Sequence, residues 1–117
     1  MMVDCHILRG KLGEKPRWHR YVIDVTEGST VLEVLHMIRQ LDPGLAYTIH
    51  HCKMGVCGGC MMVINGRKRL ACRTLVNQSE LRIEPVPGLL VIKDLLVDLF
   101  AMHQKYLMQR KKTHEMP

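Results

Sequence analysis

Hydrophobic and polar positions alternate near the N-terminus, and this pattern predicts two short strands. The first covers residues 3–8. The second covers residues 21–25, where Tyr21, Ile23 and Val25 fall on one face and their neighbours on the other. The link over residues 10–16 contains glycines and a proline, so we expect a wide hairpin between the two strands.

A helical pattern follows the second strand. Thr30 and Glu33 have the spacing of a capping box, in which both side chains satisfy backbone N–H groups at a helix start. Asp42-Pro43-Gly44 predicts the end of this helix, since proline and glycine interrupt helices. Its apolar stripe consists of Val31, Val34, Leu35, Ile38 and Leu41.

The second half of the chain predicts more strands. Residues 45–60 form a glycine-containing loop, and a short strand follows at 61–64. Asn65-Gly66 is a strong tight-turn signal, after which residues 70–72 return as a strand. A last strand covers residues 81–84 and ends at the prolines that follow it.

A second helix is expected from Ile92 to about Gln109. Its stripe consists of Ile92, Leu95, Leu96, Leu99, Met102, Tyr106 and Leu107. We therefore predict an α+β fold in which residues 1–90 form the domain, residues 91–110 a helix that docks on the domain or on a partner, and residues 111–117 a basic, mobile tail.

Composition describes an ordinary globular chain of 117 residues, with 47% hydrophobic and 24% charged residues. No run of about 18 apolar residues predicts a membrane span. No secretory signal opens the chain, so we expect a cytoplasmic protein or one bound at the cytoplasmic face of a membrane complex.

The net charge of +6 could suit an anionic partner. We expect no nucleic-acid binding, because no nucleic-acid motif is present and aromatic residues make up only 4%.

Four of the five cysteines are spaced C-x4-C-x2-C-x11-C, at Cys52, Cys57, Cys60 and Cys72. Plant-type [2Fe–2S] clusters are held by four thiolates in the order C-x4-C-x2-C…C, so these residues are candidate cluster ligands. An oxidised cluster with its thiolates carries about −2, which would lower the net charge to about +4. The fifth, Cys5, lies at a strand start and is expected to be a small buried residue.

The residues between the candidate ligands suit a cluster-binding loop. Gly55, Gly58 and Gly59 permit tight turns and expose backbone N–H groups that can donate hydrogen bonds to sulfur. Met54 could shield the cluster from water. His50 and His51 precede the first ligand and are interpreted as solvated loop residues, or as donors to a cluster sulfur.

Three other uses of these cysteines stay open. A structural zinc site usually pairs two close C-x2–4-C knuckles, whereas only Cys57 and Cys60 form one. Disulfides would need an oxidising compartment. A Rieske-type centre would replace two cysteines with histidines. The spacing favours the [2Fe–2S] cluster over all three.

Several motifs occur in the same order as in a known family. They are Cys52-Lys-Met-Gly-Val-Cys57-Gly-Gly-Cys60, Asn65-Gly66-Arg67, Leu70-Ala71-Cys72, Arg82-Ile83-Glu84-Pro85-Val86-Pro87 and the segment from Val91 to Leu99. The chain resembles, over roughly residues 3–108, the N-terminal domain of the iron–sulfur subunit of succinate dehydrogenase and fumarate reductase.

This resemblance implies a β-grasp, plant-type ferredoxin-like fold and a [2Fe–2S] cluster on Cys52, Cys57, Cys60 and Cys72. It also implies a flavoprotein subunit whose FAD exchanges electrons with the cluster. Family members continue into a second domain with further iron–sulfur clusters, whereas this sequence ends at Pro117 without more cysteines. We therefore expect either that those centres lie in a further iron–sulfur subunit or that the downstream electron path differs, and we expect contact with a membrane only through the complex.

The sequence thus predicts a non-catalytic electron-transfer subunit of an oxidoreductase complex. No arrangement of residues suggests a catalytic acid, base or nucleophile. The alternatives are a free-standing ferredoxin, a [2Fe–2S] redox sensor and a zinc-bound interaction module. The Arg67-Lys68-Arg69 run is interpreted as a solvated turn, or as a docking patch for an acidic partner surface.

Overall fold

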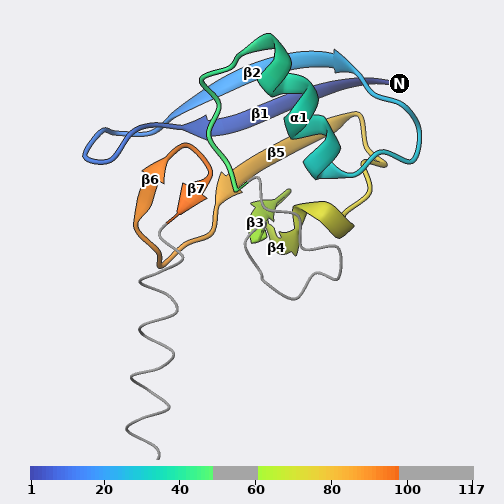
Figure 1. Ribbon diagram of the computed structural model, residues 1–117. Coiled ribbons are helices and arrows are strands. Elements are labelled where there is room, and N and C mark those ends of the chain that lie inside the picture. Colours follow the sequence, from blue (N-terminus) through green and yellow to red (C-terminus); the bar gives the residue numbers. More distant parts are fainter. Residues whose placement is uncertain (49–60, 98–117) are drawn as a thin grey trace, which may run out of the picture.

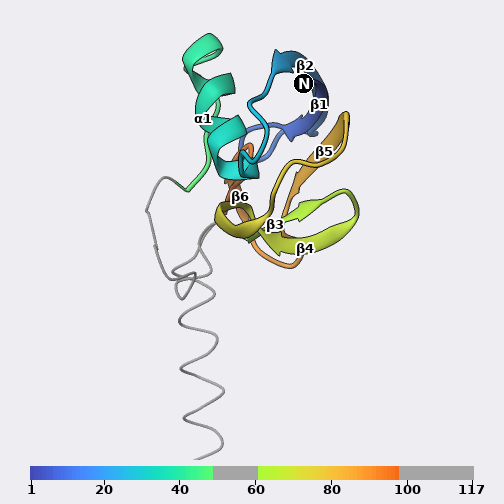
Figure 2. The same cartoon turned by 90° about the vertical axis from the view of Figure 1, so that its right-hand side faces the viewer.

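The computed structural model describes residues 1–48 and 61–97. A five-stranded mixed sheet has the order β2-β1-β5-β3-β4, and a separate pair is formed by β6 and β7 (Figure 1). One α-helix, α1, lies across one face of the sheet (Figure 2). The bounds are β1 Met2–Arg9, β2 Arg17–Asp24, α1 Val31–Leu41, β3 Met61–Ile64, β4 Arg67–Leu70, the 3-10 helix η1 Ala71–Arg73, β5 Glu80–Pro85, β6 Val91–Lys93 and β7 Leu96–Val97.

The centre of the sheet joins two strands, β1 and β5, that lie far apart in the sequence. β1 pairs with β2 in an antiparallel hairpin and with β5 in parallel. β5 also pairs with β3, which forms a second hairpin with β4. β2 and β4 are therefore the two edges of the sheet. The predicted α+β class is confirmed.

The core lies between α1 and one face of the sheet. Alternate residues Val3, Cys5 and Ile7 of β1 are fully buried, as the period of a strand requires. The other buried residues come from β2, α1, β3 and β5 and include Ile23, Val31, Val34, Leu35, Ile38, Met62, Ile64, Leu81 and Ile83. Leu41 was expected on the buried stripe, but it is 72% exposed because α1 ends there, beyond the sheet.

Local signals place most elements where the sequence predicts them. Thr30 is the N-cap of α1, and its Oγ1 accepts a hydrogen bond from Glu33 N at 3.2 Å. Asn65 and Gly66 have φ angles of +49° and +84°, as a tight primed turn requires. The strand after this turn differs from the prediction, because β4 begins at Arg67 and residues 71–73 form η1.

The prediction of a helix that starts at Ile92 is wrong for its first residues. Residues 91–97 form β6 and β7, and Asp94 between them has a φ of +51°. Short apolar runs do not distinguish a helix from a strand, and asparagine or aspartate tolerates the left-handed conformation. The rest of the predicted helix and the basic tail lie outside the described residues, so the division of domains at residue 90 stays a prediction.

Candidate iron–sulfur centre

The candidate ligands fall on both sides of the boundary of the described structure. Cys72 lies in η1 and is described. Cys52, Cys57 and Cys60 lie outside the described residues, as do Met54, Gly55, Gly58, Gly59, His50 and His51. The described part of the site therefore consists of Cys72 and of the chain on either side of residues 49–60, which the structure describes up to Thr48 and again from Met61.

Hydrogen bonds fix the turn that carries Cys72. Thr74 Oγ1 donates to the Leu70 carbonyl at 2.8 Å and closes the turn around η1. The Thr74 carbonyl accepts from Val31 N at 2.8 Å, which ties the turn to the first residue of α1. Cys72 is half-buried and packs against the core cluster. Its sulfur is thus held on a rigid support at the end of the β3–β4 hairpin.

The same hairpin brings the returning chain beside Cys72. β3 begins at Met61, the residue after the candidate ligand Cys60. Met61 pairs with Leu70, two residues before Cys72. Two chain segments that the sequence separates by ten residues are therefore neighbours across one pair of strands.

The chain that leads up to residue 49 is held in place by partly buried hydrogen bonds. The Tyr47 hydroxyl is hydrogen-bonded to His36 Nδ1 of α1, and burial raises the pKa of Tyr47. Ala46 N donates to Asp94 Oδ2 at 2.9 Å, and the Ala46 carbonyl accepts from Leu95 N at 3.1 Å. Thr48 is buried, and its Oγ1 has no hydrogen-bond partner among the residues that the structure describes. These contacts position the chain up to the cysteine-bearing segment.

Asp94 is the centre of this arrangement, and sequence analysis missed it by assigning it to a helix start. Besides Ala46 N, its carboxylate accepts from Gly10 N at 3.1 Å and pairs with Arg9 Nη2 at 3.2 Å. Its own N–H donates to the Gly10 carbonyl at 2.7 Å. An aspartate within an apolar run is the only sequence signal for this role, since aspartate is among the residues enriched in the left-handed region.

Arg9 extends the network from Asp94 to the end of α1. It donates through Nη1 to Tyr21 Oη at 2.7 Å and to Asp42 Oδ2 at 2.5 Å. Burial alone would lower the pKa of Arg9, but the hydrogen bonds that Arg9 donates to Asp94, Tyr21 and Asp42 outweigh it, and the pKa is raised. The hydrogen bonds from Tyr21 and Arg9 lower the pKa of Asp42. The network therefore stays charged at neutral pH.

Cys5 differs from Cys72 in its burial. It is fully buried in the middle of β1. Burial, and to a smaller extent the nearby Asp4 carboxylate, raises its pKa to about 12. Because iron binds the thiolate, a thiol held protonated in the core is unsuited to it. The expectation that Cys5 is a small buried residue is confirmed.

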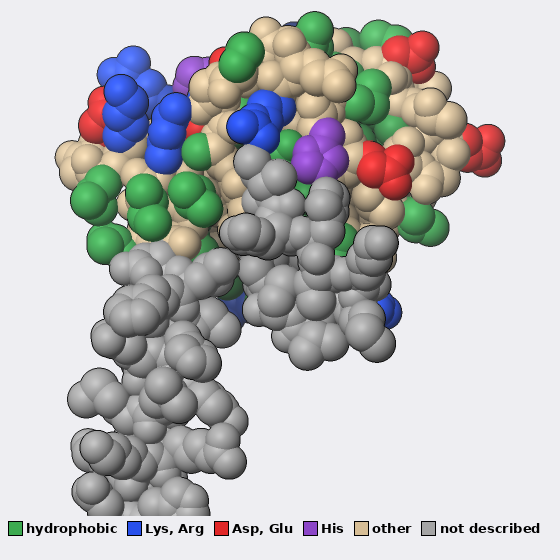
Figure 3. Space-filling view, viewed as in Figure 1, with side chains coloured by type: hydrophobic (Ala, Val, Ile, Leu, Met, Phe, Trp, Pro, Cys, Tyr) green, Lys and Arg blue, Asp and Glu red, His purple; other side chains and the backbone are tan. Residues whose placement is uncertain are grey.

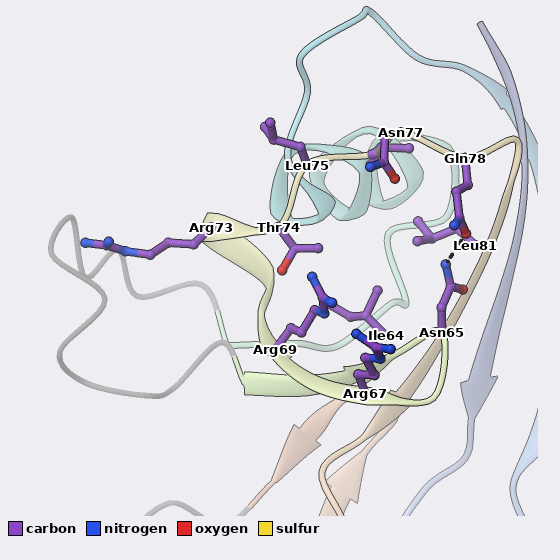
Figure 4. A pocket seen from close by; sticks show the side chains of 11 residues that line it. Ile64, Asn65, Arg67, Arg69, Arg73, Thr74, Leu75, Asn77, Gln78 and Leu81 are labelled. Atoms are coloured by element: carbon purple, nitrogen blue, oxygen red, sulfur yellow. Dashed lines mark hydrogen bonds between the residues drawn. The ribbon is translucent and has the colours of Figure 1, made fainter.

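Positive charge surrounds the hairpin that leads to Cys72. A pocket of about 640 Å³ is lined by β4, η1 and the segment that follows. Figure 4 shows Arg67 and Arg69 side by side in it, while Arg73 extends away from them. Nearby positive charge stabilises the reduced, more negative form of an iron–sulfur cluster and so raises its reduction potential.

Residues 1–48 and 61–97 contain no group of three His, Cys, Asp or Glu side chains placed to hold a metal ion. α1 has eleven residues, and the described segments contain no helix with the length and apolar character of a membrane span.

Known proteins are similar to this chain over most of its length. Residues 5–104 match the family of the 2Fe-2S iron-sulfur cluster binding domain. The fumarate reductase iron-sulfur subunit of Wolinella succinogenes is 43% identical over an alignment of 88 residues, which covers 72% of this chain and 36% of that protein. The mitochondrial succinate dehydrogenase [ubiquinone] iron-sulfur subunit 1 of Oryza sativa subsp. japonica is 38% identical over 96 residues, covering 79% of this chain and 34% of that protein.

A solved structure agrees with these relatives. A chain of the Mycobacterium smegmatis Sdh1 complex in the apo form has a TM-score of 0.77 and 27% identity, with 99% of this chain and 47% of that chain covered. The present chain thus spans about a third of the curated relatives that it matches. The predicted family and the predicted [2Fe–2S] cofactor are confirmed. The chain belongs to the 2Fe-2S iron-sulfur cluster binding domain family, as a relative of the iron–sulfur subunits of succinate dehydrogenase and fumarate reductase.

Proposed function

We propose that Cys52, Cys57, Cys60 and Cys72 are the four ligands of the [2Fe–2S] cluster. The observation that carries this assignment is the contrast between the two described cysteines. Cys72 is half-buried on a fixed turn beside the start of β3, whereas Cys5 is sealed in the core with a raised pKa. Excluding Cys5 leaves exactly the four cysteines that have the plant-type spacing.

The role that we propose is an electron relay. When bound, the cluster accepts and returns one electron at a time. The chain itself supplies the thiolates and presents arginines that stabilise added negative charge. By the family relationship, one exchange partner is the FAD of a flavoprotein subunit, and the other is a further iron–sulfur centre in another subunit or segment.

The fold that we propose for this role is the β-grasp. Its support is the mixed sheet, in which the first and fifth strands pair in parallel at the centre and α1 crosses one face. Figure 1 shows the chain that follows α1 running down towards the β3–β4 hairpin before residue 49. Such a support can keep a cluster-binding loop in one conformation without the loop forming regular structure of its own.

Cysteine substitutions test the ligand assignment. The chain is loaded with iron and sulfide, and visible absorption, electron paramagnetic resonance and a potentiometric titration are recorded. The unmodified protein should show a [2Fe–2S] spectrum and a one-electron titration. Cys72→Ser should lose or markedly alter this spectrum, while the matched control Cys5→Ser should keep it if the protein folds. Identical spectra for Cys72→Ser and the unmodified protein would remove Cys72 from the ligand set.

Cys5→Ala is a second control, because a hydroxyl in the core could itself prevent folding. A tightly bound colourless zinc ion in place of the iron–sulfur spectrum would contradict the relay. A second experiment addresses the partner: the loaded chain is mixed with a flavoprotein subunit of a related complex, and reduction of the cluster is followed when the flavin is reduced. No electron transfer under these conditions would count against a flavin partner.

A further inference from the structure

The pocket beside β4 carries several positive charges. The described residues that line it include Arg67, Arg69 and Arg73, and none of these described residues is an aspartate or glutamate. Among the residues that the structure describes, the side chains of Arg67 and Arg69 form no hydrogen bond or ion pair. An unpaired pair of guanidinium groups in a concave, polar site is suited to anionic oxygen.

The register of the hairpin explains why these two arginines share the pocket. Arg67 pairs with Ile64 and Arg69 with Met62, and residues directly opposite in an antiparallel pair lie on the same face. Ile64 and Met62 are buried in the core, so the arginines point to the core-facing side of the edge strand. The pocket lies where this side is left open between β4 and residues 74–78 (Figure 4).

A second basic pocket offers a useful contrast. It is lined by the β1–β2 hairpin and the end of β6, and its basic side chains gather at that end of the molecule in Figure 3. Its lining includes Glu14 and Asp94, and Arg9 there is paired with Asp94. Lys93 Nζ donates to the Gly44 carbonyl at 2.6 Å. Its charge is partly compensated within the chain, which leaves the β4 pocket as the stronger anion site.

We propose that the pocket formed by Arg67, Arg69 and the segment 74–78 binds an extended acidic segment of a protein partner. This inference rests on the proposed electron-transfer function and adds where the redox partner docks. β4 is an edge of the sheet, so a partner strand can pair with its outer side. Alternate side chains of such a strand would lie on the same face as the two arginines, about 7 Å apart, which is the spacing of carboxylates at alternate positions.

Two features make a protein segment a better occupant than the other anions. The pocket holds about 640 Å³, far more than one small anion fills. Its lining contains no aromatic side chain on which a nucleic-acid base could stack. The site also adjoins the proposed centre, because Cys72 follows Arg69 by three residues on the same stretch of chain. A partner seated on β4 is therefore next to a cluster ligand.

The hairpin supplies its own matched control. Lys68 lies between the two arginines on β4 but faces the opposite side of the sheet, and it does not line the pocket. Arg67→Glu, Arg69→Glu and Lys68→Glu change the net charge of the protein by the same amount. Only the first two change the charge of the pocket, so long-range attraction and local binding are separated.

The test is calorimetric titration of the loaded protein with a hexaglutamate peptide at low salt. We expect binding that weakens as salt is added, a loss of affinity of about tenfold or more for each arginine variant, and a change of less than about threefold for Lys68→Glu. Nuclear magnetic resonance should place the shifted side-chain signals at Arg67 and Arg69. A neutral hexaglutamine peptide should not bind.

Several outcomes would overturn the proposal. They are no binding of hexaglutamate, equal losses for Lys68→Glu and Arg69→Glu, inorganic phosphate that displaces the peptide at similar concentration, and an oligonucleotide of equal charge that binds more tightly. The spectrum and one-electron titration of each variant report the cluster independently of the peptide. A failed titration with an intact cluster therefore rejects the docking site alone, and a missing cluster rejects the proposed function.

Discussion

Removal of the Asp94 carboxylate is the most informative test of how the fold supports the centre. Asp94 is 3% exposed and joins three segments, since it accepts hydrogen bonds from Gly10 N and Ala46 N and pairs with Arg9. Asp94→Ala leaves two backbone N–H groups and part of the Arg9 guanidinium without a partner. It also places alanine at a φ of +51°, where an L side chain other than aspartate or asparagine is unfavourable.

The expected loss of stability follows from these contacts. Breaking a buried ion pair typically costs about 3–5 kcal/mol. The lower end applies here, because Arg9 keeps Asp42 and Tyr21 as partners. The left-handed conformation adds about 1 kcal/mol for alanine. We therefore expect Asp94→Ala to lower the free energy of unfolding by about 4 kcal/mol, and Asp94→Asn, which tolerates this φ, by about 2–3 kcal/mol.

The assay is urea unfolding of the loaded protein, followed by circular dichroism, with the midpoint and slope compared between variants. Asp24→Ala is the control, because Asp24 forms an exposed ion pair with the N-terminal amine and is 78% exposed. It should change the unfolding free energy by less than about 1 kcal/mol. The second readout is the rate at which a chelator bleaches the cluster, which Asp94→Ala should increase, since Ala46 leads into the cysteine-bearing segment.

Two results would refute this reasoning. If Asp94→Ala and Asp24→Ala have the same midpoint, the Asp94 network contributes nothing to stability. If Asp94→Ala is destabilised but the cluster bleaches at the unchanged rate, the network supports the fold and does not position the cysteine-bearing segment.

Three further predictions concern local features. Thr30→Ala should lower the free energy of unfolding by about 1 kcal/mol through loss of the cap on α1, and an unchanged urea midpoint would contradict this. Gly66→Ala should cost about 1–2 kcal/mol because φ is +84° there, while Gly44→Ala, whose added Cβ meets only ordinary contacts, should cost less than half as much. Asp42 has a folded-state pKa below its ordinary 3.8, so the stability it contributes is present above that pH and is lost as the pH falls through the lowered pKa. Acid titration of Asp42→Asn should therefore show a smaller loss of stability over this range than the unmodified protein, and identical curves would count against the ion pair.

Local sequence signals predicted much of the fold correctly. Alternation identified β1, the capping box identified the start of α1, and Asn65-Gly66 identified the turn between β3 and β4. Each of these signals acts over a few residues, through side-chain period, cap hydrogen bonds or allowed φ angles. They can be read from a sequence because no distant residue is needed to produce them.

The errors occurred where distant residues decide the conformation. Residues 92–97 have an apolar pattern that also suits a helix, but Lys93 bridges to Lys11, and Asp94 is held by Gly10 and Ala46. These partners lie far away in the sequence, so the pattern around Asp94 alone does not show them. Leu41 was misassigned for a related reason, because the extent of the sheet under α1 determines which helix positions are covered.

The sequence by itself predicted the chemistry of the centre. Four cysteines in the plant-type order predict the cluster and its ligands, because the ligand types and the loop between them are properties of a short stretch of chain. The sequence separated Cys5 from the four spaced cysteines, and the tertiary structure added the raised pKa of Cys5, since burial against other strands produces it. Only the tertiary structure shows that Arg67 and Arg69 line the same pocket. Strand register and the position of residues 74–78 determine what these two side chains face. Covalent spacing can specify a ligand set, but burial and charge arise from contacts between segments that the sequence keeps apart.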